Sequence, residues 1–267
     1  MIDTIIVSGG DIQSDFALYF LKKNIEKAGR EKIRLIAADR GLEFFLDYLI
    51  LPDVVIGDFD SLSEDGKNFL EIRDGENSDK GSLTGEQRNK EDLAKKTKDE
   101  DIPYGGMLEW KLQKGEGKVV EVVRLRPEKD DSDTQSAMNY AIRNGAKEIV
   151  ILGVTGNRVD HLMANFGLLV LAQKQGAEVV LADRYNYMKL ISSGSVLKKA
   201  EQFGKYVSFF PLGGDVTGLT LEGFKYPLDK YHLTTADSGL TVSNEISEEY
   251  AKVTYESGTL LMIMSRD

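Results

Sequence analysis

Cysteine is absent from this sequence, which excludes both a disulfide framework and catalysis by a thiolate. No stretch approaches the roughly 18 consecutive apolar residues that a membrane-spanning helix needs. The first residues, MIDTIIVSGG, also lack the charged start and the long apolar run of a signal peptide. We therefore expect a cytoplasmic protein with no membrane partner.

The sequence also has fewer positively than negatively charged residues. Lysine and arginine number 34, whereas aspartate and glutamate number 44, so the formal net charge is −10. Proteins that bind nucleic acid carry clustered lysine and arginine for the phosphate backbone, and this balance argues against such a partner. A small anionic substrate is compatible with it if metal ions offset the negative field.

Two common nucleotide-binding motifs are not found. The sequence contains no GxxxxGK[ST] loop, and no GxGxxG follows the first run that could form a strand. Both a P-loop kinase and an ordinary dinucleotide-binding dehydrogenase are therefore disfavoured.

What the sequence does contain is two successive patterns of apolar residues. In the first part of the chain, short β-branched runs alternate with amphipathic stretches such as Asp15 to Ala28 and His161 to Gln175. This pattern predicts an α/β doubly wound parallel sheet domain over 1–185. The expected strands are TIIV, IRLIAA, DVVIG, VVEVVRL, EIVILG and EVVLA. The remainder is rich in turns and alternates in polarity, which predicts a smaller all-β sandwich domain over 186–267.

A charged segment at about 73–117 fits neither pattern. It includes GEQRNKEDLAKKTKDED and the only tryptophan, Trp110. Structureless connections longer than about 12 to 15 residues are uncommon inside compact domains unless they are lids or are disordered. We favour a solvated surface excursion. An active-site lid anchored by Tyr104, Met107 and Trp110 is the alternative.

Glycines and acidic residues follow five of the expected strands. The segments concerned read SGGD at 8–11, ADRG at 38–41, GDFDS at 57–61, RPEKDDSDT at 126–134 and GVTGNRVDH at 153–161. Ligands of a doubly wound sheet bind outside the carboxyl ends of its strands. We therefore expect these segments to converge on one site.

Two pairs of aspartates in these segments indicate a metal site. Asp58 and Asp60 are two residues apart, as are Asp131 and Asp133, and in an extended segment this spacing points both side chains the same way. Neighbouring carboxylates repel each other, and Mg²⁺ relieves the repulsion by binding one or two of them together with phosphate oxygens. For Asp133 there is a simpler alternative, because it or Ser132 can cap the helix that follows.

Other residues at the strand ends suit a nucleotide. Glycines let main-chain N–H groups approach an anion closely, and they occur here as Gly9, Gly10, Gly153 and Gly156. Arg158 supplies a planar fork of donors for phosphate oxygens. Asp39 has a simpler interpretation, in which it pairs with Arg40 or sits in an ordinary turn. Taken together, the segments indicate a metal–nucleotide site.

Five segments, taken in order, closely resemble motifs of the bacterial thiamine pyrophosphokinase family. They are AADRGL at 37–42, PDVVIGDFDSL at 52–62, PEKDDSDTQSAMNYAI at 127–142, TGNRVDHLMANFGLL at 155–169 and GLTVSNEI at 239–246. The resemblance implies an α/β nucleotide-binding domain followed by a thiamine-binding β-sandwich, assembled as a homodimer. It also implies transfer of the pyrophosphoryl group of Mg-ATP to the hydroxyl of thiamine, giving thiamine diphosphate and AMP.

The resemblance further implies roles for individual residues. The Mg²⁺ ligands would be Asp58, Asp60, Asp130 and Asp133. The nucleotide would contact Gly9, Gly10, Asp39, Arg40, Lys129, Thr155, Gly156 and Asn157. Arg158 and Asp160 would lie beside the phosphates and the thiamine hydroxyl, and would complete a catalytic set with Asp58, Asp60 and Asp133. Ser243 and Asn244 would touch the pyrimidine ring of thiamine across the dimer interface.

One departure and two other functions qualify this interpretation. Asn157 stands where many members of the family have glycine, but asparagine tolerates a left-handed backbone better than other non-glycine residues, so we expect the loop to be preserved. A metal-dependent phosphohydrolase could use the same acids, with water replacing the acceptor hydroxyl. A non-catalytic thiamine- or nucleotide-binding protein is the second alternative.

Overall fold

The structure, a computed structural model, describes residues 1–76, 120–126, 131–156, 158–237 and 239–267. Most of the charged segment at 73–117, with Tyr104, Met107 and Trp110, lies outside the described residues. Lys129, Asp130 and Asn157 lie outside them as well.

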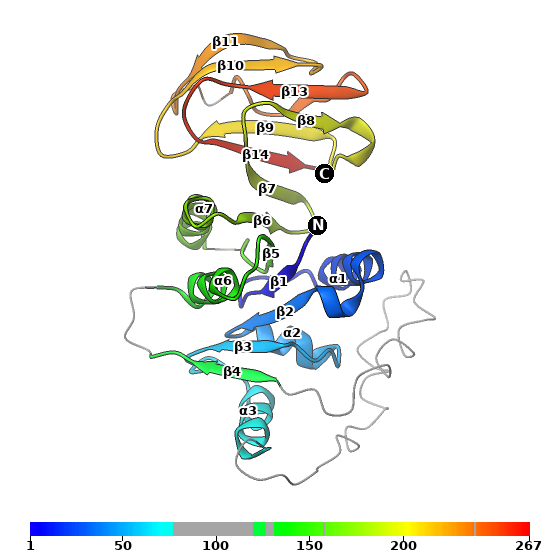
Figure 1. Cartoon of the computed structure of the whole chain (residues 1–267), viewed down its shortest axis with the longest axis vertical. Helices are drawn as coiled ribbons and strands as arrows, with labels where there is room; N and C mark the ends of the chain where they lie inside the picture. Colours follow the sequence, from blue (N-terminus) through cyan, green and yellow to red (C-terminus); the bar gives the residue numbers. More distant parts are fainter. Residues whose placement is uncertain (77–119, 127–130, 157, 238) are drawn as a thin grey trace.

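A ten-stranded sheet runs through the molecule in the order β12-β9-β14-β7-β6-β5-β1-β2-β3-β4 (Figure 1). Its parallel part consists of β1 (Thr4–Val7), β2 (Arg34–Ala38), β3 (Val54–Gly57), β4 (Glu121–Arg124), β5 (Glu148–Leu152) and β6 (Glu178–Ala182). Each of these strands falls within a run expected from the sequence. From β1 the chain builds β2, β3 and β4 on one side, and only later β5 and β6 on the other.

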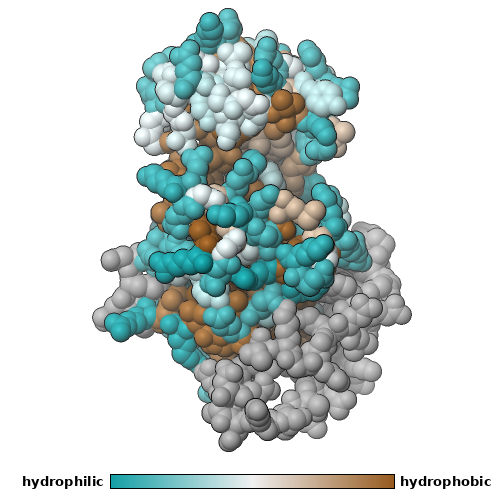
Figure 2. Space-filling model, in the orientation of Figure 1, coloured by the Kyte–Doolittle hydropathy of each residue, from teal (hydrophilic) through white to brown (hydrophobic). Residues whose placement is uncertain are grey.

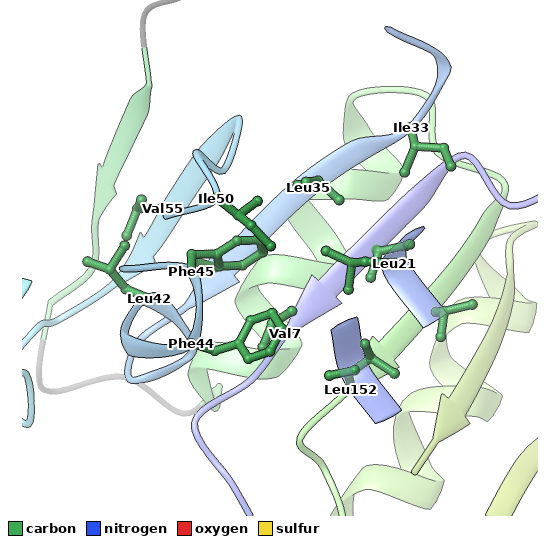
Figure 3. Close-up of a cluster of buried hydrophobic side chains, with 14 of the residues drawn as sticks. Val7, Leu21, Ile33, Leu35, Leu42, Phe44, Phe45, Ile50, Val55 and Leu152 are labelled. Atoms are coloured by element: carbon green, nitrogen blue, oxygen red, sulfur yellow. The ribbon is translucent and has the colours of Figure 1, made fainter. Parts of the chain in front are cut away.

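Helices cover both faces of this parallel part. One face carries α1 (Ser14–Ala28), α2 (Gly41–Asp47) and α3 (Glu64–Glu76), whereas the other carries α6 (Asp133–Arg143) and α7 (Val159–Lys174). Side chains alternate along each strand, so Val7 packs with α1 and α2 while Ile6 packs with α6 and α7. Figure 3 shows the first of these two cores, with Leu21 and Phe45 packed over the sheet. The doubly wound α/β sheet is therefore confirmed.

The rest of the chain forms the expected antiparallel sandwich. One layer consists of β7 (Asn186–Ile191), β9 (Tyr206–Pro211), β12 (Asn244–Glu245) and β14 (Leu260–Ser265). The other is a four-stranded sheet of β8 (Ser195–Lys198), β10 (Val216–Glu222), β11 (Leu228–Leu233) and β13 (Tyr250–Thr254). Val207 and Phe209 from the first layer pack against Leu219 and Val253 from the second.

The two regions of the chain share hydrogen bonds between strands. β7 pairs antiparallel with β6, from Val180 opposite Lys189 to Ala182 opposite Tyr187, so the parallel sheet continues directly into one layer of the sandwich. The sequence did not predict this continuity.

The surface carries mainly polar side chains on the face seen in Figure 2, with apolar residues visible between them. Among the helices that the structure describes, none is both long enough and apolar enough to cross a membrane.

Candidate active site

Three aspartates meet at the carboxyl ends of the parallel strands. Asp39 directly follows β2, Asp58 directly follows β3, and Asp133 begins α6. One carboxylate oxygen from each lies within 4.8 Å of the others. The sequence predicted that Asp58 and Asp133 lie together, and the structure adds Asp39 as the third member of what we call the aspartate cluster.

Asp39 is held in an unusual conformation. Its φ of 46° is left-handed, and its N–H donates to the carbonyl oxygen of Ile56 across 2.8 Å. One carboxylate oxygen, Oδ2, accepts a hydrogen bond of 2.6 Å from the Ser61 hydroxyl. The other, Oδ1, is buried without a hydrogen-bond partner among the described residues. A buried carboxylate oxygen is costly unless it is paired or binds a cation, so the aspartate cluster fits Mg²⁺.

Asp60 does not belong to the aspartate cluster. Phe59, between Asp58 and Asp60, has a left-handed φ of 66° and a buried ring. The segment is therefore not extended, and the prediction that Asp58 and Asp60 point the same way was wrong. Asp60 is exposed, and its main-chain N–H donates to Oδ1 of Asp58 at 3.3 Å. Its role as a metal ligand stays a prediction.

The start of α6 combines the two roles considered for Ser132 and Asp133. The Ser132 hydroxyl caps the helix by accepting a hydrogen bond of 3.1 Å from the N–H of Gln135. Asp133 occupies the next position and faces the aspartate cluster. Asp131 instead accepts a hydrogen bond from the Gln135 side chain and is not a member of the aspartate cluster.

The loops after β1 and β5 touch where the order of the strands reverses. The N–H of Gly10 donates to the carbonyl oxygen of Gly153 at 3.0 Å, and a Cβ at Gly10 would lie only 2.3 Å from that oxygen. Thr155 and Gly156 continue the β5 loop, and Gly156 lies against Asp11. Close contact between the loops is thus one reason for glycine here, and reversal of strand order is where doubly wound sheets bind ligands.

Arg158 and Asp160 form an exposed ion pair at the start of α7. Nε of Arg158 donates to Oδ1 of Asp160 at 3.2 Å, and a second bond joins the guanidinium to Oδ2. The hydrogen bond from Arg158 lowers the pKa of Asp160 to about 2. Both side chains therefore stay charged at neutral pH and lie open to a charged ligand.

Arg40 lies on the other side of the β1 loop. It precedes α2, and a Cβ at Gly9 would come within 2.8 Å of the Arg40 Cβ. A polar pocket of about 180 Å³ is lined here by Gly9, Gly10, Ile12, Ser14, Arg40, Glu43, Phe44 and Asp47. The structure thus brings Arg40 next to both Gly9 and Gly10, as expected for neighbours in one site.

Comparison with known proteins gives two family matches. A family model described as "Thiamin pyrophosphokinase, catalytic domain" matches residues 110–181, and one described as "Thiamin pyrophosphokinase, vitamin B1 binding domain" matches residues 195–260. The solved structure of thiamine pyrophosphokinase from Bacillus subtilis has a TM-score of 0.69 and 26% identity, with 99% of each chain covered. This chain belongs to the thiamine pyrophosphokinase family.

Further comparisons give the range of similarity within the thiamine pyrophosphokinase family. The curated thiamine pyrophosphokinase of Bacillus subtilis (strain 168) is 35% identical over 140 residues, which are 52% of this chain and 65% of that protein. The crystal structure of the Geobacillus thermodenitrificans protein has a TM-score of 0.68 at 25% identity, covering 100% of this chain and 98% of that one. A second curated relative, "Thiamine pyrophosphokinase 1" of Oryza sativa subsp. japonica, is 25% identical over 155 residues. The match spans 65% of the length of the Bacillus protein and 58% of the length of the Oryza protein.

Within the region matched as the vitamin B1 binding domain, Asn244 has a structural role. The side chain is only 1% exposed; its Oδ1 accepts from the Tyr226 N–H at 3.0 Å, and its Nδ2 donates to the Tyr226 carbonyl at 2.8 Å. The amide is thus bonded within this chain, and its contact with thiamine stays a prediction. Ser243 is exposed with a left-handed φ of 55°, and its contact with thiamine stays a prediction.

Sequence reasoning missed several residues around the site. Ser61 bonds Asp39, and the buried hydroxyls of Ser8 and Thr134 contact each other beside Asp133. Ser8 and Thr134 both lie in the segments that follow strands, which is the signal that could have drawn attention to them. Their pairing spans 126 positions and is visible only in the fold.

Proposed function

We propose that this chain is a thiamine pyrophosphokinase that transfers a pyrophosphoryl group from ATP to the hydroxyl of thiamine. The observation that carries the proposal is the aspartate cluster of Asp39, Asp58 and Asp133, located at the strand ends of a member of this family. Phosphoryl chemistry depends on positioning and on neutralising charge, and this geometry suits both.

The aspartate cluster would hold Mg²⁺, and Asp60 and Asp130 are the further ligands that we propose. When bound, the metal neutralises the charge of the triphosphate and orients it. The chain's own cations act on the same phosphates. Arg158 can exchange its bond with Asp160 for phosphate oxygens, and Arg40 lies beside the two glycines that follow β1.

The proposed reaction forms one bond and breaks another. The hydroxyl oxygen of thiamine attacks the β phosphorus of ATP, and the bond from that phosphorus to the oxygen bridging the α and β phosphates breaks. AMP leaves with that oxygen, and the proton of the hydroxyl is released to solvent. Asp160, held ionised by Arg158, is placed to orient the hydroxyl if the acceptor lies at the start of α7.

We further propose that the active unit is a homodimer. Ser243 directly precedes β12, and β12 is seven strand positions from β2, which leads to Asp39. Neighbouring strands are about 4.8 Å apart, so the start of β12 and the end of β2 are separated by roughly 30 Å across the sheet. Both cannot touch one thiamine within a single chain, which supports completion of each site by the partner's Ser243 region.

Mixing two inactive variants tests the dimer. Chains with Asp58→Asn and chains with a Ser243 substitution that abolishes activity should recover activity when mixed, because a heterodimer would contain one site without either change. No recovery, despite confirmed exchange of subunits, would place both residues in the same chain's site and contradict the proposal.

We propose that the chain divides into two domains, 1–185 and 186–267. The family matches, which end at 181 and begin at 195, support this division.

We also propose that the protein is cytoplasmic, because an enzyme that consumes ATP needs the cytoplasmic nucleotide pool.

Product analysis tests the function itself. With ATP, Mg²⁺ and thiamine, phosphorus NMR should show AMP and thiamine diphosphate, and neither should form when thiamine is omitted. ADP would indicate ordinary transfer of the terminal phosphate. Loss of ATP without thiamine would indicate a phosphohydrolase, and binding without turnover would indicate a non-catalytic protein.

A further inference from the structure

Ser8 and Thr134 form a buried hydroxyl pair next to the aspartate cluster. Ser8 follows β1, Thr134 is the second residue of α6, and their oxygens are 2.5 Å apart. The two residues are 7% and 9% exposed. Buried hydroxyls need hydrogen-bond partners, and here one hydroxyl donates to the other.

We propose that this pair is a positioning device for the carboxylate of Asp133, and that it thereby sets the affinity of the aspartate cluster for a divalent cation. The proposal rests on the metal site described under the proposed function. Ser8 and Thr134 are positioning residues in it, since neither belongs to the aspartate cluster itself.

The argument begins with how the first turn of α6 is held. The first N–H groups of a helix have no partner within the helix, so the position of this turn depends on its cap and its side-chain contacts. Ser132 supplies the cap from within the same segment. The Ser8–Thr134 bond adds a contact with a different element, the end of β1.

The main chain at Ser8 is held in place by hydrogen bonds of the sheet. Its N–H donates to the carbonyl oxygen of Leu152 at 2.9 Å, and β1 is paired with β2 on one side and β5 on the other. Asp39 follows β2, the direct neighbour of β1. The hydroxyl pair therefore fixes α6, and with it Asp133, relative to the strand that leads to Asp39.

The Ser8–Thr134 contact matters for metal binding because the carboxylates of the aspartate cluster repel one another. One carboxylate oxygen from each aspartate lies within 4.8 Å of the others, and the three negative charges repel one another. A contact that restrains the first turn of α6 therefore helps to hold Asp133 in position for a cation. Groups that orient metal ligands from outside typically change metal affinity or activity 10- to 100-fold when they are mutated.

Thr134→Val and Thr134→Ser form the matched pair that tests the proposal. Valine keeps the branched shape without the hydroxyl, whereas serine keeps the hydroxyl. With Mn²⁺ as the probe, followed by electron paramagnetic resonance on the full-length protein, we expect Thr134→Val to bind about 10- to 100-fold more weakly. Thr134→Ser should bind like the wild type.

A double variant separates positioning from stability. Thr134→Val alone leaves the Ser8 hydroxyl buried without a partner, whereas adding Ser8→Ala removes both hydroxyls and should restore much of the lost thermal stability. Mn²⁺ affinity should stay low in the double variant. Affinity that recovers together with stability, or that never falls in Thr134→Val, would overturn the proposal. A wild-type protein that binds no Mn²⁺ would instead overturn the metal site on which the proposal rests.

Discussion

The N–H of Gly10 donates a hydrogen bond to the carbonyl oxygen of Gly153, joining the loops after β1 and β5 at 3.0 Å. Neither residue tolerates a side chain. A Cβ at Gly10 would lie 2.3 Å from the Gly153 oxygen, and a Cβ at Gly153, where φ is 71°, would lie 2.4 Å from the carbonyl oxygen of Ser8. The two loops therefore hold each other's position at the point where the strand order reverses.

We expect Gly10→Ala to lower the free energy of unfolding by about 1–3 kcal/mol, because the loops must separate to admit the methyl group. ATP binding should weaken as well, which calorimetry can measure. Gly167→Ala is the control, since a Cβ there meets nothing within 4 Å. It lies inside α7 and should stabilise the protein by about 0.5–1 kcal/mol. Equal effects of both substitutions would contradict the contact argument.

Asp39→Asn should stabilise the metal-free protein while removing its response to Mg²⁺. Asparagine tolerates the left-handed φ of 46° and can still accept from Ser61, so the substitution tests charge alone. Relief of repulsion among carboxylates within 4.8 Å should contribute about 1 kcal/mol or more. Thermal denaturation with and without Mg²⁺ measures both effects. An unchanged response to Mg²⁺ would exclude Asp39 as a ligand.

Asn244→Ala should destabilise the protein by about 1–3 kcal/mol, because the Tyr226 main chain loses the partners that Asn244 provides. Ser243→Gly should stabilise it by up to about 1 kcal/mol, because glycine adopts the left-handed φ without strain. Chemical denaturation measures both. If Asn244→Ala is as stable as the wild type and loses only affinity for thiamine, the sequence-based role of Asn244 is correct after all.

Arg158→Ala should raise the pKa of Asp160 from about 2 toward its ordinary value of 3.8. The pKa of Asp160 is lower in the folded than in the unfolded state. The contribution of the ion pair to stability is therefore fully present when the pH is above the unfolded-state pKa, and it is lost as the pH falls through about 2. Carbon NMR titration of the Asp160 carboxyl group measures the change. Arg184→Ala, which breaks a different ion pair with Asp15, is the control and should leave Asp160 unaffected.

Much of the fold could be predicted because the parallel strands are buried on both faces and read as short β-branched runs. The six runs from TIIV to EVVLA each contain an observed strand. The pairing of β7 with β6 could not be predicted in this way. NYMKLI has a strand-like pattern, but which edge it joins depends on tertiary packing.

The site was predictable where it depends on strand ends and not where it depends on backbone conformation. Asp58 and Asp133 follow from the rule that ligands bind beyond the carboxyl ends of strands. Asp60 was misplaced because nothing in the sequence signals a left-handed phenylalanine at Phe59. The structural bond of Asn244 was not predicted, because its partner, Tyr226, is 18 residues away and is reached only through folding.

The continuity of the ten-stranded sheet restricts how this chain can open and close. Many two-domain enzymes rotate about a flexible linker, but here β6 and β7 join the two regions through paired strands rather than through a free linker. Rotation of one region against the other would have to break that ladder or twist the whole sheet. Substrate entry and product release should therefore depend on loops at the strand ends and on contacts between chains, not on hinge closure within one chain.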